Sequence, residues 1–290
     1  MKKILSLLLA GCLAAVCLAG CGNPAQKVME SVLSQAGAGG ENAKPADANT
    51  PGGGVSTATK SYSEAYTLMS NITSGISDVI DAALAKHNES LDSDDPESLS
   101  SVIAMYFLSI DFAFTASLNE EATEEILGAA FSFLQIEDFA LTKNAPHDYT
   151  LRFTGASEGN QFEMHAQYDV GTGALRYVET KDGALKEFVE FVPLGNGRYV
   201  LQNNYQRGVV EYDGSKVKSF TLSSASGTLE EGEYYTPEQD GVYPGGAGAD
   251  AAWVVARGDD LAQRFVYDGS SLQIDTVDFM GSKKDMTIPA

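Results

Sequence analysis

The chain has 290 residues, of which 40 are acidic and 19 basic, so its formal net charge is −21 at pH 7. We expect no nucleic-acid partner, because binding phosphates requires a basic surface. The three cysteines, Cys12, Cys17 and Cys21, all lie near the N-terminus. The rest of the chain therefore has no disulfide, zinc-thiolate cluster or thiol nucleophile, and we expect no cofactor and no metal.

The first twenty residues have the pattern of a bacterial export signal. Lys2 and Lys3 precede an apolar run, Ile4–Leu18, that is too short to be a stable transmembrane helix. The run leads into Leu18-Ala19-Gly20-Cys21, which resembles the lipobox of bacterial lipoproteins. In that family the cysteine is diacylated on its sulfur and a peptidase cuts just before it. The resemblance implies a signal peptide over residues 1–20 and lipidation of Cys21.

A second motif, Leu9-Ala10-Gly11-Cys12, would leave an apolar core at the lower limit for a signal peptide, so Cys21 is the expected site. The alternative is a plain secretory signal in which the cysteine is incidental. Lipidation would anchor the chain to the membrane on its extracytoplasmic side. Without Lys2 and Lys3 the mature chain has 17 basic and 40 acidic residues, a net charge of about −23.

Residues 21–60 are rich in glycine, alanine, asparagine, proline and serine, which is typical of a flexible linker. A coil of this length spans about 30–40 Å. A single α+β domain is predicted to follow over residues 61–290, with helices in 61–137 and a sheet in 138–290.

Three helices are predicted. Apolar residues at spacings of three and four predict the first over Ser61–His87, where Ser61 and Glu64 form a capping-box pattern. A second helix, apolar nearly all round, is expected from Ser98 to about Ser117. A third is expected from Glu120 to about Gln135, capped by Asn119 or Ser117.

From about Asp138 the apolar period changes to two, which indicates strands. Asp182-Gly183, Asp213-Gly214 and Asp268-Gly269 are hairpin signals, so successive strands should pair antiparallel in one meander. Apolar residues at 188, 189, 191 and 192 suggest a sheet whose middle is buried on both faces. A sheet of about eight to ten strands is predicted, from strand-like runs at 149–154, 161–168, 175–180, 187–192, 198–202, 208–212, 217–222, 253–256, 263–267 and 272–279.

The predicted fold class is therefore α+β: three N-terminal helices followed by a large curved antiparallel meander sheet, packed on the apolar second helix. A large sheet with helices on its concave side resembles the periplasmic lipoprotein carriers and related lipid-binding lipoproteins at the level of fold. The resemblance implies a cavity between sheet and helices.

Catalytic and metal motifs are better explained as structure. Gly155-Ala-Ser-Glu-Gly159 matches the serine-hydrolase pattern G-x-S-x-G, but strands flank it on both sides, which favours a hairpin loop. Asp92-Ser-Asp-Asp95 lacks the later ligands of a calcium loop and favours helix capping. The histidines, His87, His147 and His165, have no metal-ligand spacing.

The favoured function is a non-catalytic, membrane-anchored binding module for an apolar ligand, a lipid or an envelope protein. The alternatives are a cell-envelope hydrolase with an unrecognised carboxylate site, and a structural or sensory partner of a membrane protein, engaged through the long acidic and glycine-rich segment Ser223–Ala252. The candidate ligand-binding residues are aromatic: Phe107, Phe112, Phe114, Phe131, Phe133, Tyr234, Tyr235 and Tyr243.

Overall fold

The computed structural model describes residues 59–89, 112, 114–131, 136–155, 159–204, 206–225, 261–277 and 283–289. The helical elements are α3 (Tyr62–Asn88), the 3₁₀ turn η2 (Phe114–Ser117) and α5 (Glu124–Phe131). The strands are β1 (Glu137–Ala145), β2 (Asp148–Thr154), β3 (Gln161–Tyr168), β4 (Leu175–Lys181), β5 (Ala184–Gly195), β6 (Arg198–Asn203), β7 (Gln206–Tyr212), β8 (Val217–Ala225), β9 (Leu261–Tyr267), β10 (Ser271–Val277) and β11 (Lys283–Pro289).

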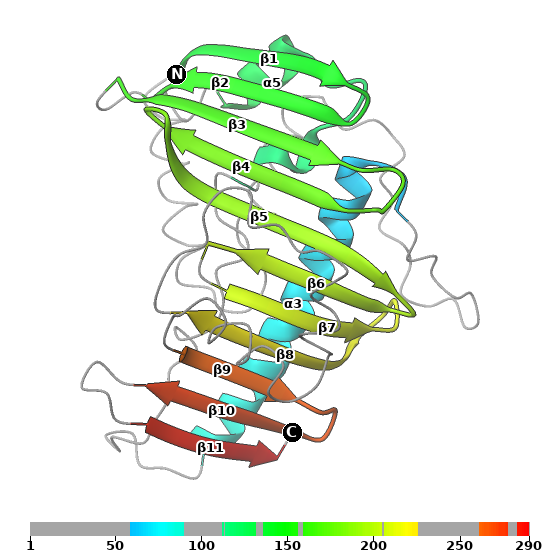
Figure 1. Cartoon of the computed structure of the whole chain (residues 1–290), viewed down its shortest axis with the longest axis vertical. Coiled ribbons are helices and arrows are strands. Elements are labelled where there is room, and N and C mark those ends of the chain that lie inside the picture. The colour runs from blue at the N-terminus through cyan, green and yellow to red at the C-terminus, as the bar shows by residue number, and fades with distance from the viewer. Residues whose placement is uncertain are drawn as a thin grey trace, which may run out of the picture.

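The strands form one 11-stranded sheet in which each strand lies beside its neighbours in sequence (Figure 1). Every neighbouring pair is antiparallel, from β1–β2 to β10–β11, which confirms the predicted meander. The pairing of β8 with β9 shows that the chain returns to the same sheet edge after residues 226–260.

The three hairpin signals are confirmed, and their chemistry is visible. At Asp182 and Gly183 both φ angles are positive, 51° and 79°, as a two-residue turn between strands requires. The Asp213 carboxylate accepts the backbone N–H groups of Ser215 and Lys216. Asp268 accepts those of the two serines that follow its glycine. The carboxylates of Asp213 and Asp268 thus accept backbone N–H groups that have no partner strand within the turn.

Helix α3 begins as its sequence predicts. Ser61 is the N-cap, and its Oγ accepts the N–H of Glu64 at 3.3 Å. The Glu64 carboxylate accepts the N–H of Lys60 at 2.7 Å, one residue before the position expected for a capping box. The predicted apolar stripe is buried at Ala65, Met69, Ile72, Ile76, Ile80 and Ala83, while Leu68 and Val79 are partly buried.

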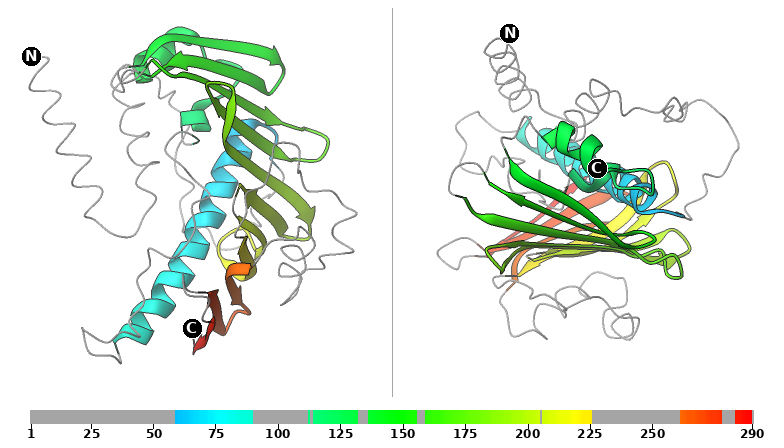
Figure 2. Two further views of the ribbon diagram at one scale, coloured as in Figure 1. Left: turned by 60° about the vertical axis from the view of Figure 1, so that its left-hand side comes forward. Right: turned by 90° about the horizontal axis from the view of Figure 1, so that it is seen from above.

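Helix α3 lies across one face of the sheet and runs along its long axis, from β3 and β4 to β8 and β11 (Figure 2). The approach to β8 is close at Gly75, where an added Cβ atom would lie 2.9 Å from a methyl group of Val217. Glycine in mid-helix normally costs about 1 kcal/mol relative to alanine. Here its lack of a side chain lets α3 pack directly on the strand.

We call the face that packs against α3 the inner face and the opposite one the outer face; Figure 1 views the outer face, with α3 behind the strands. One hydrophobic cluster joins α3 to the inner face. On β5, Val189 and Phe191 belong to that cluster, whereas Phe188 is fully buried on the outer face. The expectation that the middle of the sheet is buried on both faces is therefore confirmed at β5.

The predicted fold class is wrong. The described residues contain one long helix and a sheet that dominates the fold, not three N-terminal helices. The element that packs on the sheet is α3, the predicted first helix, rather than the second. The predicted second helix falls almost wholly outside the described residues, which place only a 3₁₀ turn at its end. The predicted third helix begins four residues late, at Glu124, and is described only to Phe131.

The sheet is also larger than expected, because β1 and β11 were not predicted. Both are edge strands. No residue of β1 is fully buried, so buried and exposed positions do not alternate along this strand. The predicted strand at 253–256 lies outside the described residues. Among the described helices, none is both long and apolar enough to cross a membrane.

Candidate functional site

A row of polar residues crosses the outer face of the sheet, one from each of seven neighbouring strands, β4 to β10. Its members are cross-strand partners in the register of the sheet. We call this set the polar row: Arg176, Glu190, Gln202, Arg207, Ser223, Arg264 and Asp275.

The first half of the polar row is a chain of side-chain hydrogen bonds. Arg176 Nε donates to Glu190 Oε1 at 2.9 Å, and the Gln202 amide donates to Glu190 Oε2 at 3.0 Å. Arg207 Nε then donates to Gln202 Oε1 at 2.7 Å. Glu190 and Gln202 have no exposed surface, and Arg207 is 3% exposed. Buried charges are tolerated where they are paired and hydrogen-bonded in this way.

The second half of the polar row has fewer side-chain hydrogen bonds. Ser223, the cross-strand partner of Arg207 and of Arg264, is fully buried, yet its Oγ has no hydrogen-bond partner among the described residues. Arg264 Nε lies 3.1 Å from the Asp275 carboxylate, close enough for an ion pair but without the geometry of a hydrogen bond. An unsatisfied buried hydroxyl costs about 1–3 kcal/mol, so its presence between two arginines requires an explanation.

Beside this half of the polar row lies a groove of about 440 Å³, within the range of small-molecule sites. Its walls include Val209, Thr221 and Val266, which are cross-strand partners on β7, β8 and β9. Each is two residues along its strand from a member of the polar row, so groove and row share the outer face. The groove also contacts Arg198, Val210, Glu211, Ser219, Phe220, Tyr267 and Asp268.

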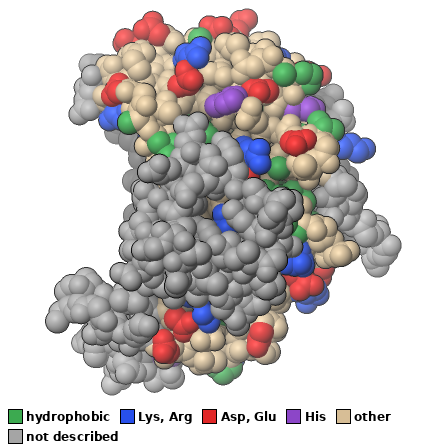
Figure 3. Space-filling model, in the orientation of Figure 1, with side chains coloured by type: hydrophobic (Ala, Val, Ile, Leu, Met, Phe, Trp, Pro, Cys, Tyr) green, Lys and Arg blue, Asp and Glu red, His purple; other side chains and the backbone are tan. Residues whose placement is uncertain are grey.

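The described arginines share the outer face, where acidic residues face most of them across the strands. Every arginine among the described residues sits next to an inner-face residue on its strand, and therefore projects outward. Arg207 is the exception to the acidic pairing, since its cross-strand partners are Gln202 and Ser223. Figure 3 shows the same face, with basic, acidic and histidine side chains interspersed over the strands at the top of the view. The arginines are Arg152, Arg176, Arg198, Arg207 and Arg264.

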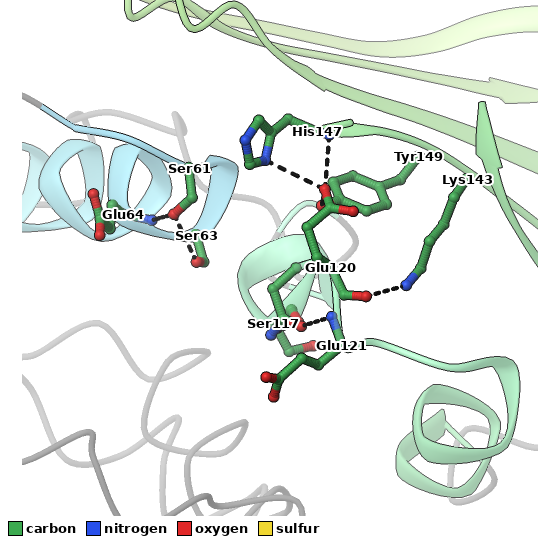
Figure 4. A network of polar contacts seen from close by, with 10 residues as sticks. Ser61, Ser63, Glu64, Ser117, Glu120, Glu121, Lys143, His147 and Tyr149 are labelled. Carbon is green, nitrogen blue, oxygen red and sulfur yellow. Dashed lines mark hydrogen bonds and ion pairs between the residues drawn. The ribbon is translucent and has the colours of Figure 1, made fainter. Parts of the chain in front are cut away.

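A second polar cluster surrounds Glu120, in the turn between η2 and α5 (Figure 4). Glu120 Oε1 accepts the backbone N–H of His147 and the hydroxyl of Tyr149, both at 2.9 Å. These bonds lower the pKa of the Glu120 carboxyl. Burial and the bond to Glu120 raise the pKa of Tyr149, so its hydroxyl stays protonated. The cluster fastens the turn to the β1–β2 hairpin, where His147 has a positive φ of 60°.

A third cluster lies on the outer face of β2 and β3. Asp148 Oδ1 accepts from His165 Nε2 and from the Asn144 amide, both at 2.8 Å, and Oδ2 accepts from Gln167 at 2.8 Å. Burial raises the pKa of Asp148, but the three hydrogen bonds outweigh it, so the pKa is lowered. Within the described residues no hydroxyl bonds His165, so this pair of histidine and aspartate lacks the nucleophile of a catalytic triad.

Nor do metal-binding groups converge in the described ranges, where no three histidine, cysteine or acidic side chains are close enough to hold an ion. Gly155 and Gly159 lie in the loop between β2 and β3, whose strands pair from Thr154 and Gln161 onward. That pairing confirms the hairpin interpretation of the serine-hydrolase pattern, while Ser157 itself lies outside the described residues.

Of the aromatic residues predicted to bind a ligand, Phe112 is the one whose side chain is described. It is fully buried, with its ring 5.0 Å from that of Tyr66 and 4.8 Å from that of Tyr177, so it packs between α3 and the sheet. Phe114 begins η2 and Phe131 ends α5, but their side chains are not described. The remaining predicted site residues, Cys21, Phe107, Phe133, Tyr234, Tyr235 and Tyr243, lie outside the described residues, as does most of Ser223–Ala252.

Sequence reasoning missed the polar row. The available signal was the presence of Arg207 and Arg264 inside strands that also carry apolar residues, since a charged group there needs a partner. The strand alternation could place each arginine on the outer face. It could not show that Ser223 lies between them.

Comparisons with protein families, with curated proteins and with solved structures find no match.

Proposed function

We propose that the chain is an exported lipoprotein anchored through Cys21, and that its domain is a non-catalytic binding module for an apolar ligand. The observation that carries the proposal is the groove of about 440 Å³ on the outer face, with valine walls beside a buried polar row. Sites for small molecules typically combine apolar walls with a few placed polar groups.

The chemistry of the described polar groups favours binding over catalysis. Hydrolysis without a metal needs a nucleophile or an activated water beside a base. In the groove, Glu211 accepts the hydroxyl of Ser219 at 3.1 Å, and no histidine is among the described walls. The Asp148–His165 pair lies on β2 and β3, strands that contribute no wall to the groove.

The anchor agrees with this role. A lipid on Cys21 followed by a linker of about forty residues would hold the domain within a few nanometres of the membrane surface. Apolar molecules are found at that surface and are scarce in water.

The test of binding is native mass spectrometry of the full chain, extracted from the membrane of its expression host. We expect a bound apolar molecule that is lost in Val209→Asp, because a carboxylate in the groove wall opposes apolar contact. Val170→Asp is the matched control, since Val170 is 66% exposed and outside the groove. A ligand-free wild-type chain, or equal occupancy in both variants, would contradict the proposed site.

The anchor is tested separately. We expect Cys21→Ser to abolish acylation and release of the signal peptide, read from the intact mass, while Cys12→Ser leaves both unchanged. The reverse result would place the lipid on Cys12, and unchanged processing in both variants would show a plain secretory signal.

A further inference from the structure

We infer that the groove takes an amphiphile, with its anionic headgroup at Arg207, Ser223 and Arg264 and its acyl chain along Val209, Thr221 and Val266. The inference rests on the proposed function and names the class of ligand.

The buried hydroxyl of Ser223 is the first argument. It is fully buried on the outer face of β8, and no described residue hydrogen-bonds it. Leu222, its neighbour in the strand, belongs to the inner core, so Ser223 points away from α3. Buried polar groups are almost always hydrogen-bonded, and an orphan suggests an absent ion, ligand or water. A ligand oxygen would supply the acceptor that Ser223 lacks.

The flanking arginines determine the charge of that oxygen. Arg207 and Arg264 are the cross-strand partners of Ser223 on either side. Neighbouring strands lie about 4.8 Å apart, so both guanidinium groups project from positions next to the hydroxyl. Gln202 holds Arg207 through a hydrogen bond to Nε, and Asp275 attracts Arg264 as an ion pair. Two arginines and a hydroxyl donor are chemically complementary to a carboxylate or phosphate.

The apolar walls determine the other half of the ligand. Val209, Thr221 and Val266 lie two residues along their strands from Arg207, Ser223 and Arg264, a distance of about 7 Å. Arg207, Ser223 and Arg264 lie just beyond the described walls of the groove, so a chain attached to a headgroup there would run into it.

Charged groups at the far end of the groove bear on the orientation of the ligand. Glu211 and Asp268 line that end together with Arg198, the cross-strand partner of Glu211. Hydrogen bonds from the turn lower the pKa of Asp268 to about 2, so it is ionised at neutral pH. Two acidic groups against one arginine make this end less favourable to an anionic headgroup than the end at Arg207 and Arg264.

The experiment measures binding to the full chain, freed of co-purified lipid in a nonionic detergent. The probes are palmitate, its neutral analogue cetyl alcohol, phosphatidylglycerol vesicles and inorganic phosphate. We expect palmitate to bind at least about tenfold more tightly than cetyl alcohol, because hydrogen bonds to a charged group are worth that much. Phosphate alone should bind at least tenfold more weakly than palmitate, since it has no chain to bury.

Two variants locate the headgroup. Ser223→Ala and Arg207→Gln should each weaken palmitate binding about tenfold and leave cetyl alcohol unchanged. Arg152→Gln is the matched control, an exposed arginine of the same face on β2. Ser223→Ala should also raise the melting temperature of the ligand-free chain by about 2–4 °C, because it removes an unsatisfied buried group. This variant carries the test if Arg207→Gln does not fold.

The outcomes separate the inference from the function on which it rests. Equal affinity for palmitate and cetyl alcohol, with no effect of either variant, overturns the inference and leaves the binding function standing. Binding of neither amphiphile overturns both. If phosphate binds as tightly as palmitate, the acyl chain contributes nothing, and the assignment of the groove to an acyl chain is overturned. Selective binding of palmitate or of phosphatidylglycerol supports the inference, and the tighter of the two identifies the source of the headgroup.

Discussion

The two faces of the sheet use the same strands for different purposes. The inner face buries aromatic side chains against α3, including Tyr149, Tyr177 and Phe191, each fully buried. Its fully buried charge is Glu179, which accepts the Tyr177 hydroxyl at 3.0 Å and Lys186 Nζ at 2.9 Å. The outer face carries the polar row and every described arginine.

The comparison shows how stability and recognition are divided within one sheet. On the inner face, each Å² of apolar surface removed from water stabilises the fold by about 25 cal/mol. Paired charges in the polar row contribute little net stability, because desolvation offsets their attraction, but losing one partner is costly. The inner face therefore holds the fold together, while the outer face fixes side chains in position. The following predictions test that division.

The largest effect is expected on the inner face. Phe191→Ala should lower the free energy of unfolding by about 3–5 kcal/mol, because it leaves a cavity and removes the stacking on Tyr199, whose ring centroid lies 5.2 Å away. Urea denaturation measures the loss. Val170→Ala, at a 66% exposed position, should change stability by less than about 0.5 kcal/mol. A loss under about 1 kcal/mol for Phe191→Ala would show that α3 does not depend on this packing.

A buried pair and an exposed pair on the outer face should differ. Glu190→Ala removes the buried carboxylate that accepts from both Arg176 and Gln202 and should cost about 3 kcal/mol. Glu163→Ala breaks the exposed pair with Arg152, whose side chains are 47% and 59% exposed, and should cost at most about 1 kcal/mol. Thermal unfolding of both variants makes the comparison. Equal losses would mean that the polar row is no more constrained than the surface.

The N-cap of α3 is expected to contribute less. Ser61→Ala removes the acceptor for the Glu64 N–H and should cost about 1 kcal/mol. Ser77→Ala is the control, because Ser77 lies in the middle of α3, away from the cap. Helical circular dichroism during denaturation reports both. If the two variants unfold alike, the cap is not formed in solution.

The smallest effect concerns pH. The folded pKa of Asp148 lies below its ordinary value of 3.8, so the unfolded chain binds more protons as the pH falls through this range. Its stabilisation is present above pH 3.8 and is lost as the pH falls toward the lower folded value. Asp148→Asn should therefore flatten the acid limb of a stability-against-pH curve and lower stability at neutral pH.

The pKa of Asp81 on α3 is shifted in the opposite direction, so its effect on stability has the opposite sign. Burial and the neighbouring Asp78 raise its pKa, so the folded chain binds more protons and ionisation destabilises it as the pH rises. Asp81→Asn should raise stability at neutral pH, where Asp148→Asn lowers it. The same direction of change in both variants would contradict these environments.

Local patterns in the sequence determined much of the fold. The spacing of Ile72, Ile76 and Ile80 determined α3, and the aspartate-glycine pairs at 182, 213 and 268 determined three hairpins and with them the antiparallel order. These signals depend on contacts within a few residues, so the chain itself displays them. The local patterns did not predict which helix packs on the sheet. The apolar character of a helix alone did not show that α3 would cover the inner face.

Only the tertiary structure decided the site. Ser223 and Arg264 are 41 residues apart in the chain, and the register of β8 on β9 makes them partners. A shift of one residue would move each side chain to the other face, and the bulge between Ser224 and Ala225 shows that register is not set by counting alone. The sequence determined which residues alternate outward on each strand. The sheet decided which of them meet, because pairing distant strands depends on packing over the whole domain.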